Sequence, residues 1–113
     1  MQIASFLNNL EFSDSKVVIT PLIESNFGKE IRIAFKEGQM MKEHKTQYPI
    51  TVMTVIGSIE FTVNEKTVTL AKGDVISLEG NVLHELKATE KSVVRLSLHK
   101  GDTVARVNGV LKL

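Results

Sequence analysis

His44 and His84 are the residues of this chain best suited to chemistry. An imidazole can ligate a transition metal, act as a general acid or base near its ordinary pKa of about 6.5, or hydrogen-bond a ligand. The chain has no cysteine, so disulfide bonds and thiol chemistry are excluded. The third histidine, His99, follows an apolar stretch and is interpreted as a solvent-exposed strand end.

The neighbours of the two histidines decide which of these roles is available. On a regular strand, residues two apart point to the same face, so Thr46 is expected beside His44. Glu43 and Glu85 each adjoin a histidine, and the same period of two turns them to the opposite face. A second strand has to bring His84 opposite His44.

The elements that must position these side chains are predicted to be β-strands. Val, Ile and Thr dominate eight short stretches, and such β-branched residues suit a pleated sheet. Turn residues separate them, as at Gly57-Ser58, Asn64-Glu65 and 72–74. Many short strands without a helix between them predict a β-sandwich or a closed barrel. The stretches are residues 16–20, 30–35, 50–56, 58–63, 67–71, 74–78, 82–88 and 92–98.

The two ends of the chain carry signals of their own. Apolar residues recur at helical spacing near the N-terminus, which predicts a short amphipathic helix covering one end of a barrel. These residues are Ile3, Phe6, Leu7 and Leu10. Asn108-Gly109 lies between two apolar stretches and predicts a β-hairpin near the C-terminus. We expect one domain over residues 1–113, with the helix and lead-in in 1–15 and the barrel in 16–113.

Residues 38–57 (GQMMKEHKTQYPITVMTVIG) resemble the first sequence motif of the cupin superfamily. Three residues are in register with this motif: Gly38, His44 and Gly57. Thr46 stands where the family has a second histidine, and Ile50 stands where it has a glutamate.

Residues 73–88 (GDVISLEGNVLHELKA) resemble the second cupin motif, with Gly73 and His84 in register. Glu79 replaces the motif's proline and Asn81 its glycine; asparagine also tolerates a left-handed backbone. The resemblance spans residues 31–98 and implies an all-β, cupin-type double-stranded β-helix, which is a jelly-roll barrel. An immunoglobulin-like sandwich explains the strands but not this register.

The resemblance also implies where a ligand binds. The family site would here consist of His44, Thr46, Ile50 and His84, with His44 and His84 the candidate metal ligands. Such donors suit zinc, iron, manganese, nickel or copper. A complete zinc site is worth about 10–16 kcal/mol. Two ligands that keep about half of this would give a dissociation constant of about tens of micromolar. We therefore favour a pocket that hydrogen-bonds a small molecule over a resident metal.

Three classes of function follow, and whether the protein is an enzyme stays open. The first is a cupin that binds or senses a small molecule without catalysis. The second is a metal-dependent enzyme of the dioxygenase, isomerase or decarboxylase type, with water and substrate completing a two-histidine centre. The third is a structural or oligomerisation module. Acid–base catalysis without metal, as in sugar epimerases of the wider group, would need a second group such as Tyr48.

Charge and hydropathy restrict the partners. The net charge is +1 with both signs interspersed, so direct nucleic-acid binding is not expected. No apolar run approaches the roughly 20 residues of a membrane span, and we do not expect residues 1–9 to act as a secretory signal. We expect a cytoplasmic homodimer. Arg95 either clamps a carboxylate ligand or lies on the outer sheet face, where it meets a glutamate or a dimer partner.

Overall fold

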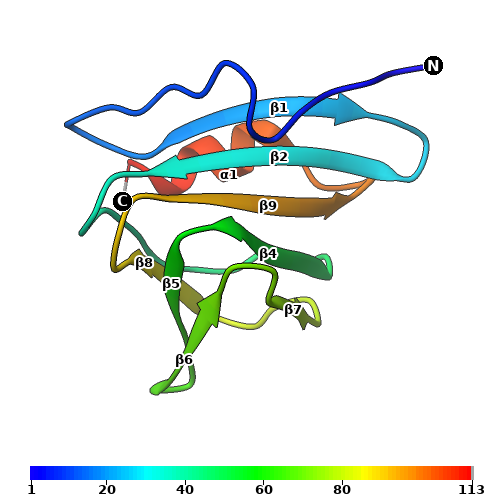
Figure 1. The fold of residues 1–113 in the computed structure, drawn as a ribbon. Helices are drawn as coiled ribbons and strands as arrows, with labels where there is room; N and C mark the ends of the chain where they lie inside the picture. Colours follow the sequence, from blue (N-terminus) through cyan, green and yellow to red (C-terminus); the bar gives the residue numbers. More distant parts are fainter. Residues whose placement is uncertain (113) are drawn as a thin grey trace.

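The computed structural model describes residues 1–112, which form nine strands and one helix (Figure 1). The strands are β1 (Val18–Glu24), β2 (Gly28–Phe35), β3 (Met40–His44), β4 (Ile50–Ile56), β5 (Ser58–Val63), β6 (Lys66–Ala71), β7 (Val75–Leu78), β8 (His84–Ala88) and β9 (Ser92–His99). The helix is α1 (Val104–Val110).

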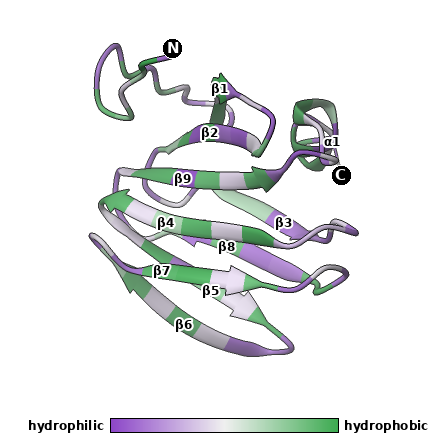
Figure 2. Cartoon of the chain, turned by 90° about the vertical axis from the view of Figure 1, so that its right-hand side faces the viewer, coloured by the Kyte–Doolittle hydropathy of each residue, from purple (hydrophilic) through white to green (hydrophobic). Residues whose placement is uncertain are grey.

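The strands form two antiparallel sheets that face each other, as Figure 2 shows from the side. The five-stranded sheet has the order β1-β2-β9-β4-β7, and the four-stranded sheet has the order β3-β8-β5-β6. Non-consecutive strands are neighbours in both sheets, which is the arrangement of a jelly roll. The prediction of an all-β double-stranded β-helix is therefore confirmed.

The core lies between the two sheets. Strand β2 contributes Ile31, Ile33 and Phe35, and β5 contributes Ile59 and Phe61, all of them buried. They alternate along their strands because successive side chains point to opposite faces. Burial of such a side chain stabilises the fold by about 1.5–3 kcal/mol.

Strand β3 is the one strand outside the eight predicted stretches. Its sequence, MMKEH, contains no β-branched residue. It forms because β8 pairs with it, with Met41 opposite Leu86 and His44 opposite His84. Tertiary pairing therefore overrides a weak local preference for the strand.

The prediction of an N-terminal helix is wrong, because no helix forms in residues 1–17. Arg32, buried on the outer face of β2, donates hydrogen bonds to the carbonyl oxygens of Ser5, Asn8 and Asn9 at 3.4, 2.9 and 3.3 Å. A helix would need these oxygens for its own backbone. Asn9 also adopts a positive φ of 54°, which ends any right-handed turn.

The prediction of a C-terminal hairpin at Asn108-Gly109 is also wrong, because both residues lie in α1. Thr103 caps this helix through its Oγ1, which accepts the backbone N–H of Arg106 at 3.1 Å. Val107 and Val110 are buried on the face that α1 turns to the barrel. Apolar residues spaced by three therefore pack as a helix, and this packing prevails over the local turn preference of Asn-Gly.

Several other predicted features are confirmed. Asn64 and Glu65 have φ of 50° and 66° in the tight turn between β5 and β6. Gly57, with φ of 90°, lies where the chain leaves the five-stranded sheet for the other one. Arg95 lies on the outer face and pairs with Glu30 at 2.6 Å.

Helix α1 has only seven residues. In the part of the chain that the structure describes, no helix has the length and apolar character needed to cross a membrane.

Gly109→Ala is expected to stabilise the protein by about 0.5–1 kcal/mol, because a helical glycine is flexible in the unfolded chain and nothing lies within 4 Å of the added Cβ. Urea unfolding measures the change. Gly73→Ala, in equally open space but at a φ of 87°, is the matched control and should destabilise. Loss of stability in Gly109→Ala would indicate a hairpin instead of α1.

Candidate functional site

The two histidines meet on adjacent strands of the four-stranded sheet. His44 ends β3 and pairs with His84, the first residue of β8. Their ring centroids lie 4.2 Å apart at an interplanar angle of 62°. The ring of Phe61 also stacks on the His84 ring, with 5.6 Å between the two ring centroids. The structure therefore brings the two predicted residues together.

A β-bulge explains how His44 comes to face the barrel. The pairing shifts between Met41 and His44, so three steps along β3 match the two steps from Leu86 to His84 on β8. Met41, Leu86 and His84 are buried, His44 is half-buried, and Glu43 is exposed. The glutamate next to His44 therefore points away from the site, as predicted.

Both imidazoles are held in one tautomer. Nδ1 of His44 lies 2.6 Å from the carbonyl oxygen of Lys42, and Nδ1 of His84 lies 2.8 Å from that of Val82. A carbonyl oxygen only accepts, so each Nδ1 must carry the proton and donate it. In the neutral ring, Nε2 is then left with a free lone pair. The site offers two hydrogen-bond acceptors.

The two rings are neutral at physiological pH. Burial lowers the pKa of His44 from 6.5 to about 4; the hydrogen bond to Lys42 opposes this shift, and the charges of His84 and Arg106 add to it. Burial also lowers the pKa of His84, with the same kind of opposition from Val82 and support from Arg106. The histidines therefore accept hydrogen bonds here and do not act as cations.

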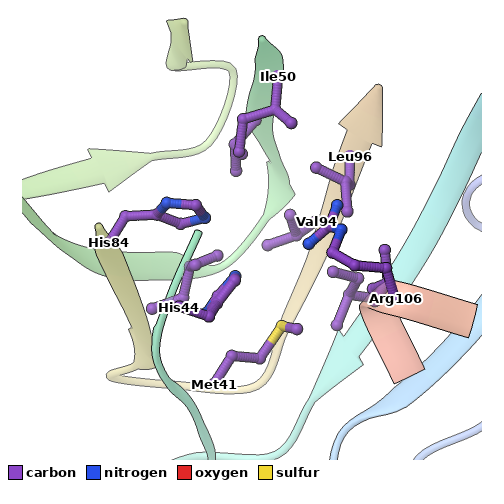
Figure 3. Close-up of a pocket in the computed structure, with 11 residues that line it drawn as sticks. Met41, His44, Ile50, His84, Val94, Leu96 and Arg106 are labelled. Carbon is purple, nitrogen blue, oxygen red and sulfur yellow. The ribbon is translucent and has the colours of Figure 1, made fainter. Parts of the chain in front are cut away.

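The rings line a small cavity inside the barrel, drawn in Figure 3. Its volume is about 10 Å³, close to the minimum for one water molecule. Ile50 lies in its wall, next to the two imidazoles. The remaining lining residues are Ile33, Met41, Val52, Leu86, Val94, Leu96, Arg106 and Val107.

Thr46 does not join the histidines in this cavity. It is buried, and its Oγ1 donates to Oδ2 of Asp102 at 2.8 Å and accepts the backbone N–H of Tyr48 at 3.2 Å. The chain has left β3 before this residue, so the period of two no longer applies. Tyr48 does not approach the histidine pair either, because its ring stacks on His99 at 4.9 Å.

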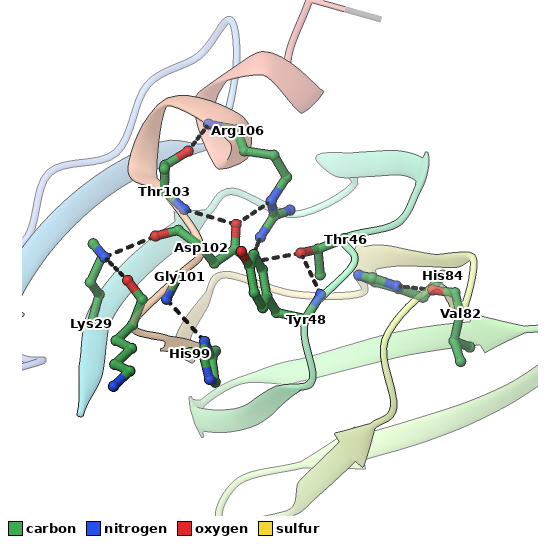
Figure 4. Close-up of polar contacts among 11 residues, drawn as sticks. Lys29, Thr46, Tyr48, Val82, His84, His99, Gly101, Asp102, Thr103 and Arg106 are labelled. Carbon is green, nitrogen blue, oxygen red and sulfur yellow. Dashed lines mark hydrogen bonds and ion pairs between the residues drawn. The ribbon is translucent and has the colours of Figure 1, made fainter. Parts of the chain in front are cut away.

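Asp102 links Thr46 to a third polar group of the barrel, Arg106. Nε and Nη2 of Arg106 donate to the two carboxylate oxygens of Asp102 at 2.8 and 2.7 Å (Figure 4). The backbone N–H of Thr103 donates to the same carboxylate at 2.8 Å. This two-pronged pair fixes the plane of the guanidinium beside the histidines.

The Asp102 carboxylate is charged although only 3% of its side chain is exposed. Burial raises its pKa, but hydrogen bonds from Arg106, Thr46 and Thr103 together hold it below the ordinary 3.8. All four hydrogen bonds fall on its two oxygens, so Asp102 has little capacity left for another cation. Its role is to hold Arg106.

The residues at this site do not fit the metal that the cupin resemblance implies. Among the residues described, no three His, Cys, Asp or Glu side chains come together as a ligand set. The guanidinium of Arg106, a permanent cation, lines the same cavity as both imidazoles. A divalent ion between the imidazoles would be repelled by this cation, and the Asp102 carboxylate paired with Arg106 offsets part of that repulsion.

Arg106 and Asp102 are the functional residues that the sequence interpretation missed. They are four residues apart, with Asp102 just before the capping residue Thr103 and Arg106 in the first turn of the helix. This spacing is the signal that could have found them, because residues four apart meet on one face of a helix. The hairpin prediction hid this signal, since a hairpin separates the two side chains.

The stability of the protein should fall between pH 6.5 and about 4. His44 titrates near 6.5 when unfolded and near 4 when folded, so the unfolded chain binds more protons in this window. The loss should be about 2 kcal/mol after allowance for partial exposure, and above pH 6.5 this group adds no pH dependence. Urea unfolding across this range should show a smaller loss of stability for His44→Gln than for the wild type. The exposed control His99→Gln should lose as much stability as the wild type.

Thr46→Val should destabilise the protein by about 2 kcal/mol, because it removes one donor from a buried carboxylate. It should also raise the pKa of Asp102. Chemical denaturation and carboxyl NMR titration measure the two effects. Thr69→Val, at an exposed position of β6, is the control and should change stability by less than about 0.5 kcal/mol. Equal stability of the two variants would contradict the role of Thr46.

Comparison with solved structures supports the fold. An RmlC-like cupin protein from Desulfovibrio desulfuricans matches with a TM-score of 0.81 and 20% identity, covering 88% of this chain and 97% of that one. A double-stranded β-helix protein from Klebsiella pneumoniae matches with a TM-score of 0.80 and 17% identity, covering 90% and 92%. A conserved protein of unknown function from Streptococcus pyogenes matches with a TM-score of 0.75 and 18% identity, covering 90% of each. At these identities the likeness concerns the fold alone.

No curated protein matches the chain. The model of the cupin domain matches residues 31–104, which include both histidines and the aspartate that holds Arg106. Together with the two facing sheets and the paired motif histidines, this match shows that the chain belongs to the cupin family.

Proposed function

We propose that this cupin binds a small molecule beside His44, His84 and Arg106, without a resident metal. The observation that carries the proposal is the set of polar groups gathered in an otherwise apolar barrel. Two neutral imidazoles offer acceptors at Nε2, and Arg106 offers donors in the same cavity. A few oriented polar groups in an apolar wall are typical of small-molecule sites.

The groups around the histidines support a binding role more than acid–base catalysis. Both rings have lowered pKa values, which reduces the fraction able to donate a proton at neutral pH. Tyr48, the candidate second acid or base, stacks on His99 away from the pair. Ile50 contributes only apolar surface to the cavity.

The alternative is a metal-dependent enzyme with a two-histidine centre. The observation in its favour is that both imidazoles carry the free lone pair on Nε2, as metal-bound histidines do. The absence of a third His, Cys, Asp or Glu donor among the described residues, and the Arg106 cation, weigh against it.

Binding is tested by ¹⁵N NMR of the imidazoles during titration with small hydroxy acids, amino acids and sugars. A ligand of this pocket should shift the Nε2 signals of His44 and His84 saturably, because both rings line the cavity. His44→Gln should weaken binding by about tenfold, the loss of one buried hydrogen bond.

The metal alternative is tested by elemental analysis of untagged protein purified without chelator, beside a His44→Ala, His84→Ala variant. We expect less than stoichiometric metal in both proteins. Stoichiometric metal that disappears in the variant would replace the binding proposal with the enzyme.

A further inference from the structure

Two hollow regions of the molecule meet at Arg106. The first is the cavity of about 10 Å³ around His44 and His84. The second is a surface depression of about 400 Å³. Arg106 is the one residue that lines both. The lining of the depression is Lys45, Thr46, Gln47, Tyr48, Asn81, Gly101, Asp102, Thr103 and Arg106.

The two spaces differ in what they can hold. The inner cavity has room for about one water molecule, so no organic ligand fits there while Arg106 keeps its place. The outer depression falls within the range of about 300–1,000 Å³ typical of small-molecule sites. The body of a ligand therefore belongs in the depression, with Arg106 at its inner end.

Arg106 retains unused hydrogen-bonding capacity. Its Nε and Nη2 hold Asp102, and within residues 1–112 its Nη1 donates no hydrogen bond. A quarter of its side chain is exposed. The clamp of Asp102, itself held by Thr46, fixes the guanidinium plane before any ligand arrives. A preorganised donor of this kind loses less entropy on binding.

We infer that this depression binds a small carboxylate whose charged group is received by Arg106, so that the guanidinium supplies the positive charge that a metal supplies in other barrels of this form. The inference rests on the proposed function, because it names the class of the small molecule and the charged group that Arg106 receives.

The charge of the depression selects a monoanion. Arg106 and Lys45 contribute two positive charges and Asp102 one negative charge, which leaves a net +1 among its lining residues. One carboxylate neutralises this excess. A phosphate dianion would exceed it and would need more N–H donors than the free end of one guanidinium provides.

A matched pair of probes separates charge from shape. Benzoate and benzamide have nearly the same size, but only benzoate is charged. Isothermal titration calorimetry should show benzoate binding at least about tenfold tighter than benzamide, because hydrogen bonds to charged groups are the stronger ones. The backbone amide signals of Gly101 and Thr103 should shift with benzoate, since both residues line the depression.

Variants assign the binding to Arg106. Arg106→Met alone leaves Asp102 buried without its cation, so Asp102→Asn accompanies it to preserve the fold. This double variant should lose benzoate affinity at least about tenfold. Arg95→Met is the matched control, because Arg95 pairs with Glu30 on the outer sheet face, and it should bind benzoate like the wild type.

The inference would be overturned by equal affinity for benzoate and benzamide, or by unchanged benzoate affinity in the folded double variant. Tighter binding of inorganic phosphate than of benzoate, or no saturable benzoate binding, would overturn it as well. Imidazole NMR keeps the two proposals apart. Ligands that shift the imidazole signals of His44 and His84 but bind equally well without Arg106 would support the proposed function and contradict the carboxylate inference. Benzoate binding that requires Arg106 but leaves both imidazole signals unchanged would support the carboxylate inference and contradict the proposed role of the histidines.

Discussion

Much of this site depends on keeping one carboxylate charged in a place almost without water. Asp102 accepts hydrogen bonds from Thr46, Thr103 and Arg106, and only these bonds offset the cost of its burial. The same contacts tie the segment after β3 to the start of α1 and hold the guanidinium against the barrel. A buried ion pair adds little net stability over apolar packing, but removal of one partner is costly. The pair therefore specifies where α1 sits more than it strengthens the fold.

This arrangement changes the electrostatics that the cupin barrel usually provides. In the family, histidines and a glutamate surround a metal; here Ile50 and Thr46 occupy two of those positions, and an arginine brings a cation from outside the motif. The two retained histidines are neutral, in part because that cation stands nearby. The absence of two motif ligands and the presence of an arginine at the same cavity are electrostatically compatible, because a metal ion and a guanidinium repel each other.

The sequence predicted the sheets and the two histidines well, because β-branched residues and motif spacing are local signals. It failed at both ends of the chain for a tertiary reason. Arg32 binds the carbonyl oxygens that an N-terminal helix would have used. The sequence of the first ten residues does not reveal this interaction, because Arg32 lies more than 20 residues further along the chain. At the other end, the burial of Val107 and Val110 outweighed the turn preference of Asn-Gly. Thr46 was predicted on the same face as His44, on the assumption that the strand continues past His44. Strand β3 ends at His44, so the alternation of faces does not extend to Thr46.

The bulge in β3 determines which kind of side chain enters the barrel. With regular alternation from Met41, the residue opposite His84 would be Glu43, and His44 would turn to solvent. Glu43 and His44 are adjacent in the sequence, and the bulge in the backbone determines that the imidazole and not the carboxylate faces the barrel interior. In such barrels, divergence of ligand preference can proceed through insertions and shifts of register without any substitution at the site.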